Sequence, residues 1–256
     1  MVNWPRAYSG PTMIYLDNNA TTRIAPEVLD AMMPFMAEAY GNPSSAHTFG
    51  RTARDAIERA RASVASFLGA AVPAEIVFTS DGTEGDNWAI TAGLGLFDGR
   101  DHIVTTNVEH EAVRNLCSRL ELTGIHVTRI EVDADGLIDP NEVAAAVTPC
   151  TAVVSIMHAN NETGVLFPVE DISALIKERS DALVHVDGVN AAGKVPIDLK
   201  TTGIDVYTVS GHKFHAAKGI GAVYIRGGIG FAPWFAGGGQ ERGRRPGTGV
   251  DQGSER

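Results

Sequence analysis

Cysteine is scarce in this 256-residue sequence, which contains only Cys117 and Cys150. Two thiols are too few for the disulfide framework of a secreted domain, and both lie in apolar-rich segments, where we expect small core positions. Long apolar runs are also lacking: none approaches the ~18 residues of a membrane span, and "MVNWPRAYSG" at the start lacks the pattern of a signal peptide. These absences predict a cytoplasmic protein with no membrane partner.

Positive charge is in short supply as well. The chain has 21 Lys and Arg against 31 Asp and Glu, a formal net charge of -10. Nucleic-acid binding depends on clustered Lys and Arg, so this balance excludes a nucleic-acid partner. The remaining composition, 44% hydrophobic and 20% charged, is that of an ordinary globular protein with a well-buried core.

Three familiar motifs are absent although parts of them are present. The stretch 188–195, "GVNAAGKV", nearly matches a P-loop, but Val195 stands where a hydroxyl must hold magnesium. "HEAVR" begins at His110 like a zinc-protease helix and then has Arg114 in place of the second histidine. "GLGLFDG" at 93–99 lacks the third glycine of a dinucleotide fingerprint. We therefore predict neither a metal site nor a nicotinamide cofactor.

Short β-rich runs alternate with helical patterns along most of the chain, which is typical of βαβ units around a mainly parallel sheet. The expected strands are residues 75–79, 102–106, 126–132, 151–157, 182–187, 205–210 and 221–226. The clearest expected helices are residues 52–69, 111–124 and 169–180. The sequence thus predicts an α/β fold.

Polar clusters directly follow several of these strands. They read "SDGTEGDN", "NVEHE", "HANNETG", "DGVNAAGK" and "SGHKFH", after the first, second, fourth, fifth and sixth strands. Ligands of open parallel sheets bind at the carboxyl ends of the strands, so the clusters predict a site at one sheet edge. Each cluster taken alone is more often a capped helix start or a polar turn.

The residue types in three of these clusters indicate which kind of ligand the site would bind. In residues 79–87, "TSDGTEGDN", a glycine-containing turn leads into a helix near Thr83, which is a phosphate cradle or a plain helix start. Asp187 ends a buried strand, where it caps a helix or pairs with a cation such as a protonated ring nitrogen. Lys213 lies between two histidines, and a lysine for Schiff-base chemistry needs a lowered pKa. Together these groups describe pyridoxal 5'-phosphate (PLP).

At this point the sequence resembles a known family, the cysteine desulfurases within the class V aminotransferases of fold-type I PLP enzymes. The matching motifs are "IYLDNNATT" (14–22), "GNPSSAHTFG" (41–50), "EIVFTSDGTEGDN" (75–87), "VEHEAV" (108–113), "VSIMHANNETG" (154–164), "HVDGVNAAGKVPIDL" (185–199), "SGHKFHAAKGIGAVYIR" (210–226) and "GGGQERGRRPGT" (237–248). The resemblance implies the PLP-binding large domain of these transferases, a mainly parallel seven-stranded sheet with helices on both faces.

The resemblance also implies roles for residues around the cofactor ring. Lys213 matches the lysine that holds PLP, and His110 matches the imidazole that stacks on the pyridine ring and moves protons. Asp187 matches the carboxylate on the pyridinium nitrogen, and Asn161 matches the asparagine beside the ring and the bound amino acid. Asn190 stands where the family usually has a glutamine bonded to the phenolic oxygen, so its shorter arm is a departure.

Another group of residues matches the phosphate end of the cofactor site. Four of them, which would hold the phosphate bound to the same subunit, are Gly82, Thr83, Ser210 and His212. Thr248 matches the threonine that reaches the phosphate of a neighbouring subunit, and this role implies a homodimer. Asp81 replaces a glycine of the usual turn and brings a negative charge close to the expected phosphate, which weakens PLP binding unless the carboxylate points away.

Family members continue beyond "GGGQERGRRPGT", whereas this sequence ends in "GVDQGSER". We expect an N-terminal segment (1–13), a PLP-binding large domain (14–248) and a tail (249–256) where the C-terminal small domain would begin. By resemblance, the missing part carries the loop cysteine that attacks the substrate sulfur and the arginine that binds the substrate carboxylate. The basic cluster of Arg242, Arg244 and Arg245 lies in the dimer-contacting motif instead.

The implied activity is PLP-dependent desulfuration of L-cysteine to L-alanine, with an enzyme persulfide passing sulfur to an acceptor protein for iron-sulfur cluster assembly or another transfer. Because the loop cysteine is absent, the 256-residue chain itself is expected to be inactive in persulfide formation. One alternative is a catalytically incomplete PLP-binding protein or fragment that binds only cofactor or a partner. Another, within the family, is a selenocysteine lyase or a different class V aminotransferase.

Overall fold

The computed structural model describes residues 14–248, so the expected segments 1–13 and 249–256 lie outside the described residues. Its strands form one seven-stranded sheet in the order β1-β7-β6-β5-β4-β2-β3. The strands are β1 Ile76–Thr79, β2 His102–Thr106, β3 His126–Ile130, β4 Thr151–Met157, β5 Leu183–Asp187, β6 Val206–Ser210 and β7 Gly221–Ile225. From β6 to β3 all neighbours pair in parallel, and β7 runs antiparallel to β1 and β6.

The helices bracket these strands. They are α1 Pro26–Ala37, α2 Thr48–Leu68, α3 Gly82–Leu94, α4 Glu111–Glu121, α5 Pro140–Ala146 and α6 Val169–Lys177, with 3-10 turns at Pro73–Glu75, Leu199–Thr201, Gly211–Lys213 and Gln240–Gly243. Neither α1, which has Pro34 inside it, nor the seven-residue α5 was expected, because neither carries a long apolar period. Among residues 14–248, no helix has the length and apolar character to cross a membrane.

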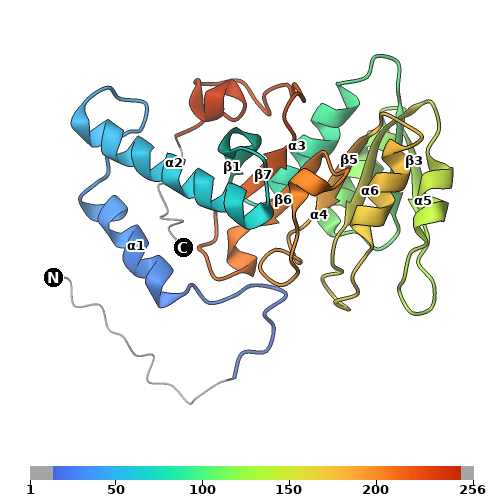
Figure 1. Ribbon diagram of the computed structural model, residues 1–256, viewed down its shortest axis with the longest axis horizontal. Coiled ribbons are helices and arrows are strands. Elements are labelled where there is room, and N and C mark those ends of the chain that lie inside the picture. The colour runs from blue at the N-terminus through green and yellow to red at the C-terminus, as the bar shows by residue number, and fades with distance from the viewer. Residues whose placement is uncertain (1–13, 249–256) are drawn as a thin grey trace.

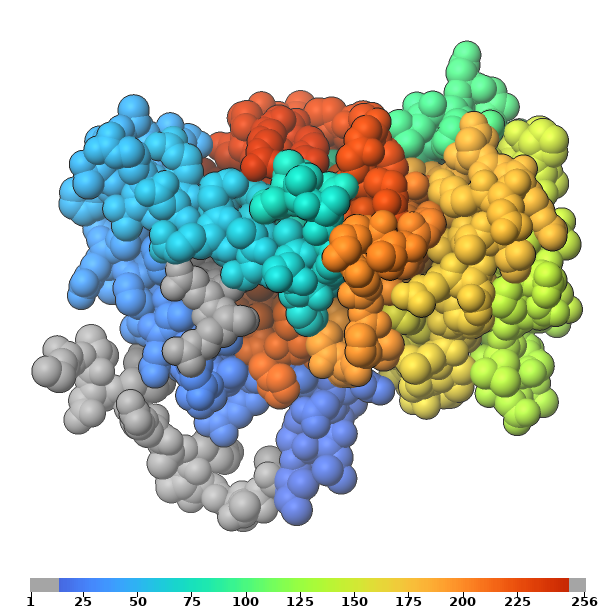
Figure 2. All heavy atoms as spheres, in the orientation of Figure 1, coloured from blue at the N-terminus to red at the C-terminus, as the bar shows by residue number. Residues whose placement is uncertain are grey.

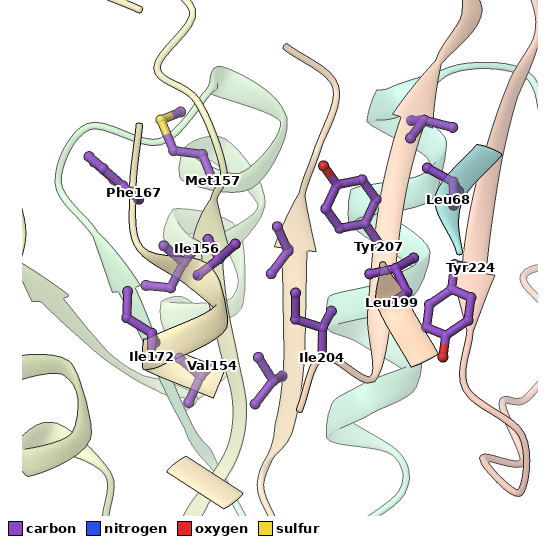
Figure 3. Packing of buried hydrophobic residues seen from close by; sticks show 14 of the residues in the cluster. Leu68, Val154, Ile156, Met157, Phe167, Ile172, Leu199, Ile204, Tyr207 and Tyr224 are labelled. Atoms are coloured by element: carbon purple, nitrogen blue, oxygen red, sulfur yellow. The ribbon is translucent and has the colours of Figure 1, made fainter. Parts of the chain in front are cut away.

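The helices cover both faces of the sheet. On one face α2, α5 and α6 bury an apolar cluster that includes Leu68, Ile172 and Tyr207 (Figure 3). On the other face α3 and α4 bury a second cluster around Trp88 and Val113. Figure 1 shows α1 and α2 at one end of the molecule and α5, α6 and β3 at the other. The mainly parallel α/β fold with helices on both faces is therefore confirmed.

The central strands explain why the sequence predicted them well. β4 and β5 are buried along their whole length, since both faces of a parallel sheet are covered. Their unbroken apolar runs are the corresponding sequence signal. The edge strand β3 is only half-buried and stops at Ile130, two residues before the expected end.

This topology aligns one edge of the sheet for a site. Strands β1, β2, β4, β5 and β6 are mutually parallel, so the five polar clusters after them meet at their shared carboxyl edge. The start of the described chain lies along the same edge, where the Thr22 N–H donates to the His212 carbonyl over 2.8 Å. Figure 2 shows this blue segment lying against orange residues of the β6 to β7 region.

Candidate functional site

The turn between β1 and α3 forms a polar cradle. Asp81 caps α3, and its Oδ1 accepts the Glu84 N–H over 2.8 Å, so this carboxylate is bound to the helix start. Gly82 and Thr83 are the first residues of α3, and their N–H groups have no partner within the helix. A Cβ on Gly82 would lie 2.5 Å from Val189 Cγ2, so glycine is needed to bring this turn against the end of β5.

The end of β6 completes the cradle. The Ser210 hydroxyl is buried and has no hydrogen-bond partner in the described chain, so it is available to a ligand. His212 follows it, with Nδ1 3.0 Å from Thr21 Oγ1. Burial and the Lys213 ammonium lower the pKa of His212, while Asp81 opposes this shift. A small anion at the α3 start therefore meets a hydroxyl and a largely neutral imidazole as well as helix N–H groups.

Lys213 lies half-buried beside this cradle, and its Nζ donates to the carbonyl of Asn19. Burial and the nearby Lys194 ammonium lower the pKa of Lys213, while Asp187, Asp17 and Glu162 oppose the shift. A lowered pKa raises the fraction of neutral amine, which a nucleophilic lysine requires. The contact with Asn19 was not predicted, because it joins residues 194 positions apart.

Asp187 is the buried carboxyl at the end of β5. It is 5% exposed, and its Oδ1 accepts the Val189 N–H over 2.9 Å. Burial and then Asp86 raise the pKa of Asp187 to about 7, whereas the Val189 N–H, His185 and His110 oppose this. A carboxyl of this kind gains most from a cationic partner, because the partner restores the charge that burial disfavours. Its helix-cap alternative is not what the structure shows, since no helix begins at residue 187.

His110 and Asn161 border the same edge from neighbouring loops. His110 caps α4, and its Nδ1 accepts the Ala112 N–H over 3.1 Å, so the neutral ring carries its proton on Nε2. The Asn161 amide donates to Glu162 Oε1 over 2.7 Å. Asn160, which the sequence did not single out, holds this loop by accepting N–H bonds from Glu162 and Thr163.

Asn190 and Thr248 complete the predicted set. Asn190 is buried, and its Oδ1 has no hydrogen-bond partner in the described chain. This amide, shorter than the family's glutamine, is therefore free to bind a ligand at the sheet edge. Thr248 is exposed at the last described position and touches none of the other predicted site residues through a hydrogen bond in residues 14–248. Its role toward a second subunit stays a prediction.

A row of buried polar side chains lies behind Asp187, and sequence reasoning missed it. His185 is fully buried, with Ser155 Oγ 2.9 Å from Nδ1 and Thr208 Oγ1 3.0 Å from Nε2. Asp86 Oδ1 lies 3.4 Å from the same Nε2. Burial lowers the pKa of His185 to about 4 and raises that of Asp86 to about 8, so both groups are neutral near pH 7 and do not form an ion pair.

Glu109 adds a further buried carboxyl next to His110. Its Oε1 accepts the Thr106 hydroxyl over 2.7 Å and the Met157 N–H over 3.1 Å, while its Oε2 has no partner in the described chain. Burial raises the pKa of Glu109 to about 8, and the charge of Asp187 adds to the shift. The sequence signal was only a glutamate in a loop, because its burial depends on packing between β2 and β4.

These raised pKa values predict how the stability of the cofactor-free protein depends on pH. Asp86, Glu109 and Asp187 keep their protons in the folded state at pH values where the unfolded chain has lost them, so the contribution of these three groups to stability is full below about pH 4 and falls as pH rises through 7 to 8. Each such proton contributes a slope of about 1.4 kcal/mol per pH unit. We expect Asp86→Asn to flatten the decline, measured by urea unfolding from pH 5 to 8.

A matched control uses a surface carboxylate. Asp171 is exposed on α6, and Asp171→Asn should leave the slope of stability against pH unchanged. An Asp86→Asn protein with the wild-type slope would show that Asp86 is already ionised at pH 5.

The two cysteines behave differently from each other. Cys117 is fully buried on α4 as expected, and burial raises the pKa of its thiol to about 11. The expectation of a core position was wrong for Cys150, which is exposed. It lies in the turn before β4, where its side chain is exposed although its carbonyl accepts the His102 N–H.

The residues at the sheet edge fit PLP. The unpartnered Ser210 hydroxyl, the Cβ-free Gly82 and the start of α3 suit a phosphate, and the unpartnered Asn190 oxygen suits a polar ring substituent. Asp187 suits a ring nitrogen that carries a proton. Lys213 is near enough to Asp187 for their charges to interact.

The sequence of this chain is similar to those of known proteins. The family model described as aminotransferase class-V matches residues 14–246. A cysteine desulfurase of Trichormus azollae is 54% identical over 237 residues, which are 93% of this chain and 59% of the relative. Cysteine desulfurase NifS of Azotobacter vinelandii is 48% identical, over 92% of this chain and 58% of the relative. The chain thus spans about three fifths of the length of these curated relatives.

Solved structures agree with the fold. A structure titled NifS-like protein superimposes with a TM-score of 0.91 and 43% identity, covering 95% of this chain and 67% of that one. A structure titled SspA in complex with cysteine gives a TM-score of 0.90 and 38% identity, covering 94% of this chain and 70% of that one.

Proposed function

This chain belongs to the aminotransferase class-V family, and we propose that it is the PLP-binding part of a cysteine desulfurase. The observation that carries the proposal is the meeting of an amine (Lys213), a buried carboxyl (Asp187) and an anion cradle at one edge of the sheet. The names of the relatives, cysteine desulfurases at about half identity, support L-cysteine as the substrate. The structure titled SspA in complex with cysteine supports the same choice.

We assign the cofactor contacts to residues at that edge. Gly82, Thr83, Ser210 and His212 would hold the phosphate, Asp187 the ring nitrogen and Asn190 the phenolic side. PLP, when bound, supplies a protonated ring that withdraws electrons from the α-carbon of an amino acid. The protein supplies the placement, the electrostatics and the exclusion of water.

The side chains of the site hold and move protons at definable atoms. Asp187 is buried and holds a proton on a cationic partner, because an unpaired carboxylate there is costly. Burial and the Lys194 ammonium lower the pKa of Lys213, so its Nζ releases a proton more readily than an ordinary lysine does. His110 has Nδ1 bound to the Ala112 N–H, which leaves Nε2 as the atom that exchanges protons. Asn161 follows β4 at the same edge of the sheet, and we assign it to orienting the amino acid.

Neither of the two described cysteines suits the role of the nucleophile that accepts sulfur from the substrate. Cys117 is enclosed under α4 with a pKa of about 11, far too high for a thiolate nucleophile. Cys150 precedes the first residue of the seven-residue β4, whereas the site follows the last one, a separation of about 23 Å along the strand. We therefore place the persulfide on neither cysteine. A homodimer through Thr248 and a separate sulfur-acceptor protein belong to the same proposal.

The test uses the 256-residue protein with added PLP and L-cysteine. We expect PLP to give a protein-bound visible absorbance band, and L-cysteine to change that band. L-lactate, which lacks the amine, should leave it unchanged. Mass spectrometry after persulfide labelling should find no modification on Cys117 or Cys150. A band that L-cysteine leaves untouched would overturn the substrate, and a persulfide on either thiol would overturn the sulfur-transfer assignment.

A further inference from the structure

The segment 237–248 is tied to the first turn of α3 by an ion pair. Arg245 Nε lies 2.8 Å from Glu84 Oε1, and Arg245 Nη2 lies 3.0 Å from Glu84 Oε2. The glutamate side chain is 9% exposed and that of the arginine 19%. A two-pronged pair of this burial is geometrically defined, unlike a mobile surface contact.

Glu84 also closes the turn that carries the cradle. Its Oε2 accepts the Ser80 N–H over 2.8 Å, while its own N–H donates to Asp81 Oδ1 over 2.8 Å. The two acidic side chains thus bind backbone groups reciprocally across residues 80–84. The N–H groups of Gly82 and Thr83, between them, belong to the first turn of α3 and have no partner within the helix.

A second anchor fixes the other end of the same segment. Arg61, 4% exposed at its side chain, binds Glu241 through Nη1 and Nη2 over 2.7 and 2.9 Å. Glu241 Oε2 in turn accepts the Phe78 N–H of β1 over 3.0 Å. Glu241 and Arg242 adopt left-handed backbone conformations with φ of 48° and 58°, which cost energy in non-glycine residues. The buried Arg61–Glu241 pair offsets this strain and holds the segment where Arg245 contacts α3.

We propose that Glu84 and Arg245 are positioning residues for the phosphate end of the site, and that their ion pair holds the 80–84 turn so that Gly82 and Thr83 present their N–H groups. This inference rests on the proposed function, since it assigns a PLP phosphate to the cradle. The charge of Glu84 also supports this role for Arg245. Without Arg245, the Glu84 carboxylate would be an unpaired negative charge at the helix start, next to Asp81, and would repel a dianionic phosphate.

The experiment compares PLP with pyridoxal, the same ring without the phosphate. Dissociation constants are measured by absorbance titration for the wild type, Arg245→Gln, Glu84→Gln and the double variant. Arg245→Gln should weaken PLP binding roughly 10-fold or more and leave pyridoxal binding within about 2-fold. The double variant should recover part of the loss, because the unpaired carboxylate is gone. Arg242→Gln is the matched control, since Arg242 lies in the same segment but pairs with half-exposed Glu58.

The outcomes separate the inference from its premise. Equal loss of PLP and pyridoxal binding in Arg245→Gln would show a general structural role and overturn the inference. If Arg245→Gln does not fold, Arg245→Lys takes its place: it keeps the charge, loses the two-pronged geometry, and should still lose PLP binding selectively. A wild-type protein that binds PLP no more tightly than pyridoxal would instead overturn the phosphate cradle of the proposed function.

Discussion

Replacing Lys213 by alanine will abolish the visible absorbance band that PLP gives on the wild-type protein. It will also abolish covalent retention of PLP after reduction with borohydride. Lys213 lies beside the cradle and within electrostatic reach of Asp187, and burial and Lys194 lower its pKa, so its amine is the nucleophile matched to this site. The measurement is absorbance spectroscopy together with peptide mapping of the reduced protein.

Lys218→Ala is the matched control for this result. Lys218 follows five positions later and is exposed, so its removal should leave both the band and the covalent label in place. Binding without the band is still expected in Lys213→Ala, because the phosphate cradle remains. A wild-type band in Lys213→Ala, with the label on another lysine, would disprove the assignment of the amine.

Gly188→Ala should destabilise the folded protein by about 3 kcal/mol, among the larger effects of a single methyl group. A Cβ at this position would lie 2.0 Å from two ring carbons of Tyr207 and 2.5 Å from its hydroxyl. Tyr207 is fully buried, and its hydroxyl lies 2.9 Å from His158 Nδ1, so the ring cannot move aside without losing that bond. Because Gly188 follows Asp187 directly, PLP binding should weaken as well. Urea unfolding gives the free energy.

Gly230→Ala supplies the comparison with the same chemical change. Gly230 is exposed, has no atom within 4 Å of a built Cβ, and does not have a left-handed backbone. Its substitution should alter stability by less than about 0.5 kcal/mol. Equal stability of the two variants would show that the strand end at 187 and 188 yields easily, and would remove the reason for glycine beside Asp187.

Much of the fold was readable from the sequence, because buried parallel strands leave a strong local signal. The run "TAVVSIM" is β4 at the predicted residues, and "HIVTT" is β2. The polar clusters after the strands predicted one shared edge as the candidate site, since the carboxyl ends of parallel strands must coincide. The elements with weaker patterns were predicted less well. The seven-residue α5 was not predicted, and the half-buried β3 ends at Ile130, two residues before its predicted end.

The supporting residues of the site were harder to predict. Asp86 and Glu109 read as ordinary acidic residues, and only the packing of α3 and of the β2 loop places them in the interior, where burial raises their pKa. Cys150 was misjudged for the opposite reason. Its apolar neighbours suggested the core, but the turn before β4 leaves it exposed.

The sequence by itself determined where the seven strands lie along the chain, the sheet edge at which the polar clusters meet, and the residue types at that edge, because these follow from local periodicity and strand direction. Only the tertiary structure decided the surroundings of those residues. Lys213 meets the Asn19 carbonyl across 194 positions, and Arg245 meets Glu84 across 161. Contacts of this span have no local pattern, since they form only when the packed sheet brings distant segments together.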